Sequence, residues 1–418
     1  MVANLMTKHD CRSFHAGRLA LAYLACLCGA TIAGAAEPHL VELLAGPHDR
    51  DGSLMIGRLP SKQQLVGLTI AKPSEPIVAQ RIPDSDEYAW RLERPLPAGQ
   101  TRQYRVTDLS QVERPHVAID ENDDAIVVRI DGRTVLQYNV ATVQPPAGLD
   151  PVYARSGFIH PLQSPAGRVV TAGFPKDHAH QHGIFSAWVR TEFEGRQLDF
   201  WNQRDRTGHV RHLSVDRVET GPVFAQFDVT LAHSDRSAPE QSRPVLQETW
   251  TVRVYHSVEP FLFDIVSTQT CIADSPLQVQ KYHYGGMAFR GTSQWLNQPE
   301  AGFLTSDRHD RQAGNHTRPK WVAATGAVDG AACTLAVLDH PANFRFPQPV
   351  RLHPSKPYFV FTPPFLGAFA LSPGQPYVSR YRYVVHDGPP AAEAYDRLWI
   401  DYGAPALVRA VADGTPRE

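Results

Sequence analysis

Short apolar runs that alternate with polar residues recur through most of the chain, and few stretches follow the period of a helix. The clearest alternation lies in residues 247–255, which read Gln-Glu-Thr-Trp-Thr-Val-Arg-Val-Tyr. Side chains alternate between the two faces of a strand, so this pattern predicts a strand with one face in water. Similar strand-like runs lie at residues 223–231, 245–255, 261–270, 277–284, 333–338, 358–361 and 377–386.

A hairpin opens this series, and a helix follows it. Residues 125–130 and 134–138 are strand-like, and the Asp131-Gly132 pair between them is a strong signal for a tight turn. The spacing of Ala, Glu, Leu and Trp in residues 391–402 suits one amphipathic helix. The pattern therefore predicts a large antiparallel β-supersandwich over residues 118–388, then a short C-terminal helix and a tail over residues 389–418.

The N-terminal part of the chain has shorter runs, at residues 65–70, 88–92 and 102–106, separated by Pro, Gly and Asp turns. This pattern predicts a small β-sandwich accessory domain over residues 38–117, with no group of residues suited to catalysis. The predicted fold class is all-β, with this small sandwich followed by the supersandwich.

The first 36 residues have the features of an export signal. Lys8, Arg12 and Arg18 precede an apolar run at residues 19–32, which ends in the small residues of segment 33–36. The run is shorter than the roughly 20 residues that a transmembrane helix needs. We therefore expect cleavage after Ala35 or Ala36, a periplasmic or secreted protein, and no membrane span.

The composition limits the classes of partner that the protein is expected to bind. The formal net charge is −2 and the pI is about 6.8, which argues against a nucleic-acid partner. Three of the five cysteines lie in the leader, and Cys271 and Cys333 remain to form either one disulfide or two buried thiols. The 35 prolines and 29 glycines are consistent with frequent turns between short strands.

The segment 174–183 carries the chemistry that stands out most. It reads Phe-Pro-Lys-Asp-His-Ala-His-Gln-His-Gly, and in an extended strand His178, His180 and His182 would share one face. Three interpretations stay open: ligands of one divalent metal ion, with Asp177, His178 and His180 as candidates; acid–base groups; or structural residues in a turn. The H-x-H-x-H spacing does not choose among them.

The residues around this segment suit a sugar site, because indole faces stack on apolar sugar faces and charged groups bind hydroxyls. We expect His178, His180, Asp199 and His283 to be catalytic. The expected substrate-binding residues are Arg155, His160, His182, Trp188, Trp201, Tyr282, His340 and Arg345.

Several of these motifs together resemble the secreted bacterial family named "methane oxygenase PmoA". They are Phe-Ile-His-Pro at 158–161, the histidine segment, Asp-Phe-Trp at 199–201, Tyr-His-Tyr-Gly-Gly at 282–286 and Asp-His-Pro at 339–341. The resemblance spans residues 119–388, although Ala179 replaces the usual proline and the position of His182 is often arginine in the family. The strand pattern also resembles the galactose-mutarotase-like supersandwich, which implies a sugar-binding concave face.

The sequence lacks a G-x-S-x-G elbow, a P-loop and a Rossmann fingerprint. This argues against serine hydrolases of the α/β type, nucleotide-phosphate enzymes and Rossmann dehydrogenases, which depend on these motifs. Our main hypothesis is an exported carbohydrate-active enzyme that acts on a sugar or glycoside by hydrolysis, elimination or epimerisation. Two alternatives remain: a glycan-binding protein without catalysis, and the metal-dependent oxidoreductase that the family name implies.

Overall fold

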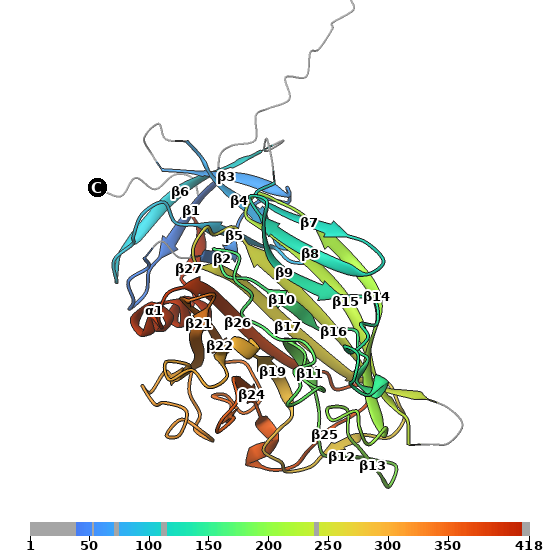
Figure 1. Cartoon of the computed structure of the whole chain (residues 1–418). Coiled ribbons are helices and arrows are strands. Elements are labelled where there is room, and N and C mark those ends of the chain that lie inside the picture. The colour runs from blue at the N-terminus through green and yellow to red at the C-terminus, as the bar shows by residue number, and fades with distance from the viewer. Residues whose placement is uncertain (1–38, 52–53, 71–74, 110–114, 238–241, 412–418) are drawn as a thin grey trace, which may run out of the picture. The chain divides into compact units, whose positions relative to one another are not determined.

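A computed structural model describes residues 39–51, 54–70, 75–109, 115–237 and 242–411 (Figure 1). The predicted leader and its cleavage site lie outside the described residues. Within them, strands predominate and the one α-helix is α1 (Ala392–Gly403), so the predicted all-β class is confirmed. No helix in this part of the chain is long and apolar enough to cross a membrane.

Two of the four sheets are eight-stranded and antiparallel, and they contain most of the strand residues. Sheet 2 has the order β23 (Val350–Leu352), β24 (Tyr358–Phe361), β19 (Gly286–Arg290), β11 (Ile184–Ala187), β10 (Ile159–Leu162), β9 (Arg133–Asn139), β8 (Ala125–Ile130), β7 (Val117–Glu121). Sheet 3 has the order β14 (Gly208–Glu219), β15 (Phe224–Asp235), β16 (Arg243–Tyr255), β17 (Phe261–Cys271), β26 (Tyr377–Asp387), β22 (Ala331–Asp339), β21 (Trp321–Val328), β20 (Gly302–Thr305).

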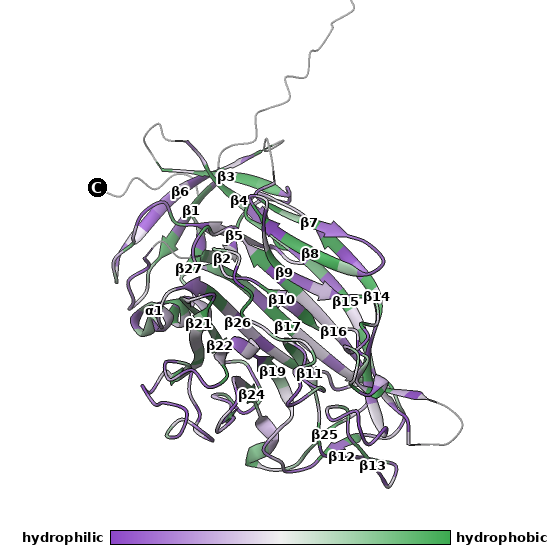
Figure 2. Cartoon of the chain, viewed as in Figure 1, coloured by the Kyte–Doolittle hydropathy of each residue, from purple (hydrophilic) through white to green (hydrophobic). Residues whose placement is uncertain are grey.

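The inner faces of sheets 2 and 3 share one hydrophobic core. Phe227, Trp250 and Phe263 of sheet 3 are buried in it with Ile126 and Phe289 of sheet 2. Strand β16 alternates as its sequence predicts, because its even-numbered residues from 246 to 254 are buried and the intervening ones from 247 to 253 are more accessible. Figure 2 shows hydrophobic residues concentrated along strands such as β8 and β9.

Sheet 1 is formed mainly by the N-terminal part of the chain. Its seven strands have the order β2 (Leu54–Arg58), β5 (Glu87–Arg91), β4 (Ile77–Arg81), β3 (Leu65–Thr69), β6 (Thr101–Asp108), β1 (His39–Leu44), β27 (Leu407–Val411). The C-terminal strand β27 pairs with β1, so residues that we expected to be part of a tail complete the N-terminal sheet. The predicted domain boundary at residue 117 stays a prediction.

Sheet 1 and helix α1 cover the outer face of sheet 3. A separate hydrophobic cluster joins Leu54 and Ala89 of sheet 1, Leu262 and Val384 of sheet 3, and Tyr395 of α1. The part of sheet 3 around β17, β26, β22 and β21 is therefore buried on both faces, whereas β14 and the outer face of β16 remain more accessible.

The remaining elements are short. Sheet 4 has the order β13 (Arg196–Leu198), β12 (Thr191–Phe193), β18 (Leu277–Val279), β25 (Phe369–Leu371), and the 3-10 helices are η1 (Pro151–Tyr153), η2 (Ser293–Trp295) and η3 (Pro363–Leu366). The expected strand at residues 277–284 is thus shorter than predicted, because it ends at Val279. Cys271 and Cys333 are both buried and both free thiols.

The shared core of sheets 2 and 3 yields a stability prediction. Replacing Phe263, which is fully buried in β17, with alanine removes a ring from this core and should lower the free energy of unfolding by about 3–5 kcal/mol. Leu213→Ala is the matched control, because Leu213 on β14 is 59% exposed and its loss should change stability by less than about 0.5 kcal/mol. Urea unfolding followed by tryptophan fluorescence measures both; equal losses would contradict the assignment of this core.

Candidate functional site

The histidine segment folds as two successive turns rather than as a strand. His178 N donates to Pro175 O at 3.0 Å, and Gln181 N donates to His178 O at 2.9 Å. At the end of the segment Gly183 has φ +59°, and a Cβ there would lie 2.1 Å from Ile159 O, so only glycine fits. The three histidines therefore do not share one face, in contrast to the arrangement expected for a strand.

His182 lies in the core. Its side chain is fully buried among aromatic rings, with the Phe174 ring centroid 4.5 Å away, and its Nε2 lies 3.3 Å from Gln203 Oε1. Burial lowers the pKa of His182 well below its usual value, so the ring stays neutral. We expected this residue to bind substrate; its packing gives it a structural role instead.

Asp177 anchors the segment to sheet 2. Its carboxylate accepts hydrogen bonds from Arg290 Nη2 at 2.9 Å and Nη1 at 3.2 Å, and Lys356 Nζ lies 3.7 Å away. Burial alone would raise the pKa of Asp177, but the hydrogen bonds and charges of Arg290 and His178 lower it to about 2. The carboxylate is therefore ionised at neutral pH and is already held by a bidentate guanidinium.

His178 and His180 lie together at the surface of the segment. Their ring centroids are 5.6 Å apart in an edge-to-face arrangement, and His178 Nδ1 lies 3.1 Å from Asp177 Oδ2. The His178 ring also contacts His353, at 5.5 Å between centroids, and Tyr358, at 5.8 Å. Burial, together with the charges of His178 and Arg290, lowers the pKa of His180 to about 4, so that its imidazole is neutral at physiological pH.

Aromatic rings continue from this pair across the outer face of sheet 2. The Tyr358 ring lies 5.8 Å from Tyr284, whose ring lies 4.5 Å from His283, which in turn lies 4.3 Å from Tyr282. Gly286 permits this approach, because a Cβ there would lie 2.5 Å from the backbone oxygen of Phe361. We call His178, His180, Tyr358, Tyr284, His283 and Tyr282 the imidazole–tyrosine row.

The row ends at a cavity that holds two of the expected site residues. Asp199 and Tyr282 both line a cavity of about 270 Å³, together with Arg190. Asp199 Oδ1 accepts hydrogen bonds from the backbone N–H groups of Trp201 and Asn202, each at 2.8 Å, so part of its role is to fix this turn. Burial raises the pKa of Asp199, which makes its protonated form more accessible than that of an exposed carboxyl.

Buried hydrogen-bond donors lie beneath the histidine segment. Arg155 is 1% exposed and donates from Nη2 to Ser186 O at 3.1 Å, while its Nε and Nη1 have no partner among the described residues. Nε2 of the buried Gln181 also has none among them. The charge of Arg155 is close enough to contribute to the lowered pKa of His180. Both side chains are almost fully buried, so they lie behind the site and do not form its accessible surface.

His160, also expected to bind substrate, adjoins this region on β10. Its Nδ1 lies 2.8 Å from Thr171 Oγ1, and burial lowers its pKa to about 4. The ring lies against Gly173, where a Cβ would come within 3.0 Å of it. His160 therefore packs behind the turn that begins the histidine segment.

The two tryptophans expected to stack on sugar are in the core instead. Trp188 is 1% exposed and its Nε1 donates to Gln269 Oε1 at 2.7 Å, while Trp201 is 2% exposed and packs on Phe185. Their apolar rings are covered because sheets 2, 3 and 4 meet there. Half-buried tyrosines of the row provide the accessible aromatic surface.

Arg345 and His340 also have structural partners. Arg345 donates to the carbonyl oxygens of Pro363 and Gly367, each at 2.7 Å, and so fixes η3. His340 Nδ1 accepts a hydrogen bond from Ala342 N at 3.0 Å and its ring contacts Tyr402 of α1. Both side chains are thus engaged by their own loops and neighbours, which is different from the expected substrate contacts.

A metal role has less geometric support here than an acid–base role. Among the described residues, the one group of three His, Cys, Asp or Glu side chains whose ligand atoms lie within 4.8 Å of one another is elsewhere, and Asp177, His178 and His180 do not meet this limit. The reason is physical: Arg290 occupies the Asp177 carboxylate and the two imidazoles meet edge to face.

Four residues that sequence reasoning missed complete the site: Arg290, Arg351, His353 and Tyr358. Arg290 pairs with Tyr358 across β19 and β24, and Arg351 Nε donates to Tyr284 OH at 3.2 Å. They are separated from the histidine segment by more than 100 residues, and no local motif marks them. Of these four residues, only Tyr358 stood out in the sequence, because it begins the predicted strand-like run at residues 358–361.

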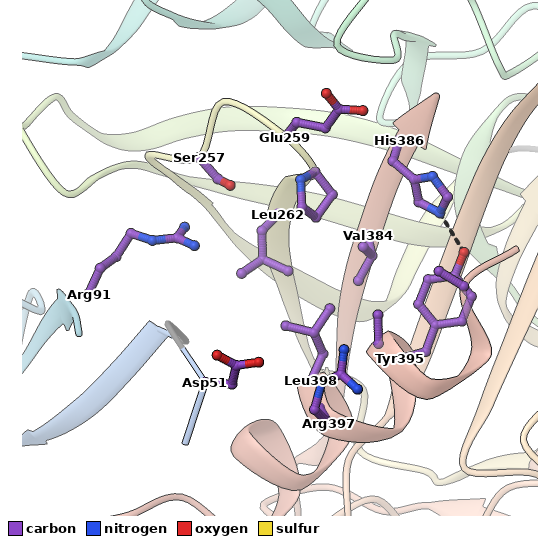
Figure 3. Close-up of a pocket in the computed structure, with 13 residues that line it drawn as sticks. Asp51, Arg91, Ser257, Glu259, Leu262, Val384, His386, Tyr395, Arg397 and Leu398 are labelled. Carbon is purple, nitrogen blue, oxygen red and sulfur yellow. Dashed lines mark hydrogen bonds between the residues drawn. The ribbon is translucent and has the colours of Figure 1, made fainter. Parts of the chain in front are cut away.

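Other cavities lie outside this group. One of about 320 Å³ is lined by residues from sheet 1, the β16–β17 turn, β26 and α1, and Figure 3 shows Arg91, Ser257, His386 and Tyr395 around it. Another, of about 410 Å³, is lined by Arg206, Arg211, Arg236 and His209, and includes the Gln203 that contacts His182. Asp150 also lines this second cavity, and its Oδ1 lies 3.8 Å from Arg206 Nη2.

The fold and the site together define an all-β protein built around two eight-stranded sheets, with an imidazole–tyrosine row on the outer face of one of them. The chain belongs to DUF6807, a family of unknown function, whose signature matches residues 125–400. No curated protein matches the chain. Among solved structures it is similar to a galactose mutarotase related enzyme from Lactobacillus acidophilus, with 10% identity, 65% of this chain and 97% of that chain covered, and a TM-score of 0.29.

The Asp177–Arg290 pair predicts an acid-sensitive contribution to stability. The pKa of Asp177 is about 2 in the folded protein, against 3.8 for the unperturbed group, so the pair stabilises the fold fully above about pH 5 and loses this effect as pH falls toward 2. Asp177→Asn leaves the buried Arg290 uncompensated and should cost roughly 3 kcal/mol at pH 7, less at pH 3. Urea unfolding at both pH values measures this; a cost that does not change with pH would contradict the prediction.

Proposed function

We propose that the protein is a carbohydrate-active enzyme whose active site is the imidazole–tyrosine row. The observation that carries this proposal is the contact of two partly accessible imidazoles, His178 and His180, beside the Asp177 carboxylate, which lies 3.1 Å from His178 Nδ1. Half-buried rings of Tyr282 and Tyr284 extend the same surface. Aromatic faces and converging donors are the features that a sugar ring requires.

The arrangement of Asp177 and His178 supports acid–base chemistry. Because Asp177 is ionised, His178 donates its Nδ1 hydrogen to that carboxylate, which fixes the tautomer and leaves Nε2 free to accept a proton. Asp177 therefore takes the role of orienting the His178 ring. The neutral His180 beside it adds a second hydrogen-bonding group, and a reaction at a sugar carbon or hydroxyl would use His178 as general base.

The other end of the row provides further contacts for a substrate. Asp199, Tyr282 and Arg190 line one cavity there, and they would hold a part of the substrate away from the reacting atoms. Burial raises the pKa of Asp199 and lowers the pKa of His283, so both groups are less readily charged than they would be in water.

Positive charge around the row favours an acidic sugar. Lys356 and Arg351 lie along it, whereas Arg290 is buried and paired with Asp177. The neighbouring cavity adds Arg211 and Arg236, and Arg206, whose Nη2 lies 3.8 Å from Asp150 Oδ1. Guanidinium groups bind carboxylates in a bidentate manner, so uronic-acid glycosides are the first substrates to test.

The proposal predicts a loss of turnover with retained binding. His178→Gln should lower kcat on a uronic-acid oligosaccharide about 100-fold or more, because the general base is gone, while the dissociation constant changes little. His39→Gln, at an exposed position on β1, is the matched control and should keep full activity. Product formation by mass spectrometry and binding by calorimetry measure both.

Three results would redirect the assignment. Glycan binding without turnover by the unaltered protein would indicate a binding protein. Turnover that survives His178→Gln and His180→Gln would place the active site elsewhere. Oxidised sugar products that require a metal would instead support the oxidoreductase that the "methane oxygenase PmoA" resemblance implies.

Export is part of the proposal, because glycans of this kind are extracellular. Expression of the full sequence in a Gram-negative bacterium should yield a periplasmic protein that begins at Ala36 or Glu37, since the Ala-rich segment 33–36 suits a signal peptidase. N-terminal sequencing of the periplasmic fraction tests this. Retention of Met1 in the cytoplasmic fraction would contradict it.

A further inference from the structure

Three potential metal ligands from separate elements converge at one end of the two large sheets. His116 immediately precedes β7, Asp131 lies in the turn between β8 and β9, and His256 immediately follows β16. His116 Nδ1 lies 2.9 Å from Asp131 Oδ1, and His256 Nε2 lies 3.2 Å from Asp131 Oδ2. We call these residues the junction triad, because they link sheet 2 with sheet 3.

The backbone holds each member of the junction triad in place. Asp131 N donates to His116 O at 2.9 Å, and His256 N donates to Val223 O at 2.7 Å. Asp131 has φ +46° in the Asp-Gly turn, a conformation that aspartate tolerates better than most residues. Arg91 of sheet 1 donates from Nη1 to His256 O at 3.1 Å. The three side chains are therefore presented by fixed strand ends rather than by a free loop.

The side chains have the chemistry of a transition-metal site. The two imidazole rings are stacked at 4.3 Å with an interplanar angle of 14°, so one nitrogen of each ring faces the same carboxylate. The ligand atoms of all three residues lie within 4.8 Å of one another. Zinc–nitrogen bonds of about 2.0–2.1 Å place neighbouring ligands roughly 3.3 Å apart in a tetrahedron, so rotations of the partly exposed side chains suffice.

The charge and exposure of the triad also fit a cation. Hydrogen bonds from His116 and His256 outweigh burial and lower the pKa of Asp131, so the carboxylate is anionic at neutral pH. The side chains are 49%, 41% and 28% exposed for His116, Asp131 and His256, which leaves water free to occupy the remaining coordination positions. Two imidazoles and one carboxylate suit zinc and similar divalent transition-metal ions better than calcium or magnesium, which prefer oxygen ligands.

We propose that the junction triad binds one divalent transition-metal ion, with zinc as its first candidate, and that the ion clips the β7–β8 end of sheet 2 to the end of β16 in sheet 3. The site is separate from the imidazole–tyrosine row and does not depend on the proposed enzymatic function. Its effect would extend to the cavity of about 320 Å³ in Figure 3, because Ser257 and Arg91 line that cavity and flank or contact His256.

The test is calorimetric titration of zinc chloride into the purified protein, prepared without a histidine tag and stripped with a chelator. We expect one equivalent to bind, and both Asp131→Asn and His256→Gln to weaken binding at least about 10-fold, the lower end of what loss of even an outer-sphere partner costs. The double variant His178→Gln/His180→Gln should bind zinc like the unaltered protein, which separates this site from the row.

Copper provides a second readout that does not rely on affinity. Electron paramagnetic resonance of the protein with one equivalent of Cu²⁺ should show coupling to two imidazole nitrogens, and to one in His116→Gln, whose partly exposed side chain can be changed without disturbing the core. Circular dichroism checks that each variant is folded. No saturable zinc binding, or binding that is lost in His178→Gln/His180→Gln and kept in Asp131→Asn, would overturn the proposal.

Discussion

The burial of the inner faces of sheets 2 and 3 against each other is the constraint on which the rest of the structure depends. Residues such as Trp250, Phe263 and Phe289 remove a large apolar area from water, and each fully buried large side chain contributes roughly 1.5–3 kcal/mol. A strand with one face in this core has only its other face left for polar chemistry. For sheet 3 much of that other face is covered by sheet 1 and α1. The candidate site lies on the outer side of sheet 2, which neither of them covers.

The polar counterpart of this constraint is the ion pair between Arg290 and Asp177. Arg290 is fully buried at the end of β19, and its charge requires a partner that stays ionised. Asp177 meets this requirement and, in the same step, sets the position of His178, which directly follows it. A single ion pair thus couples the stability of the sheet to the orientation of the imidazole that we propose as the general base. The Asp177 carboxylate thus has a structural role and, in the proposed function, a chemical role as well.

The candidate site and the junction triad use histidine in two different ways. In the site, burial and neighbouring positive charge keep His180 neutral, and Arg290 takes up the carboxylate that could have served a metal. In the junction triad both imidazoles face one carboxylate that has no guanidinium partner among the described residues. We therefore propose acid–base chemistry for the same two residue types in one place and cation binding in the other.

The sequence by itself predicted many of the strands, the Asp131-Gly132 hairpin and the C-terminal helix, because alternation and turn propensity are local properties of neighbouring residues. It did not predict others, such as β14 and β21. It also located the histidine segment as the centre of the candidate site. Tertiary structure alone decided that His182, Trp188 and Trp201 are core residues, that β27 completes sheet 1, and that Arg290 and Tyr358 join His178. These outcomes depend on contacts between residues far apart in the chain, and such contacts leave no trace in local periodicity.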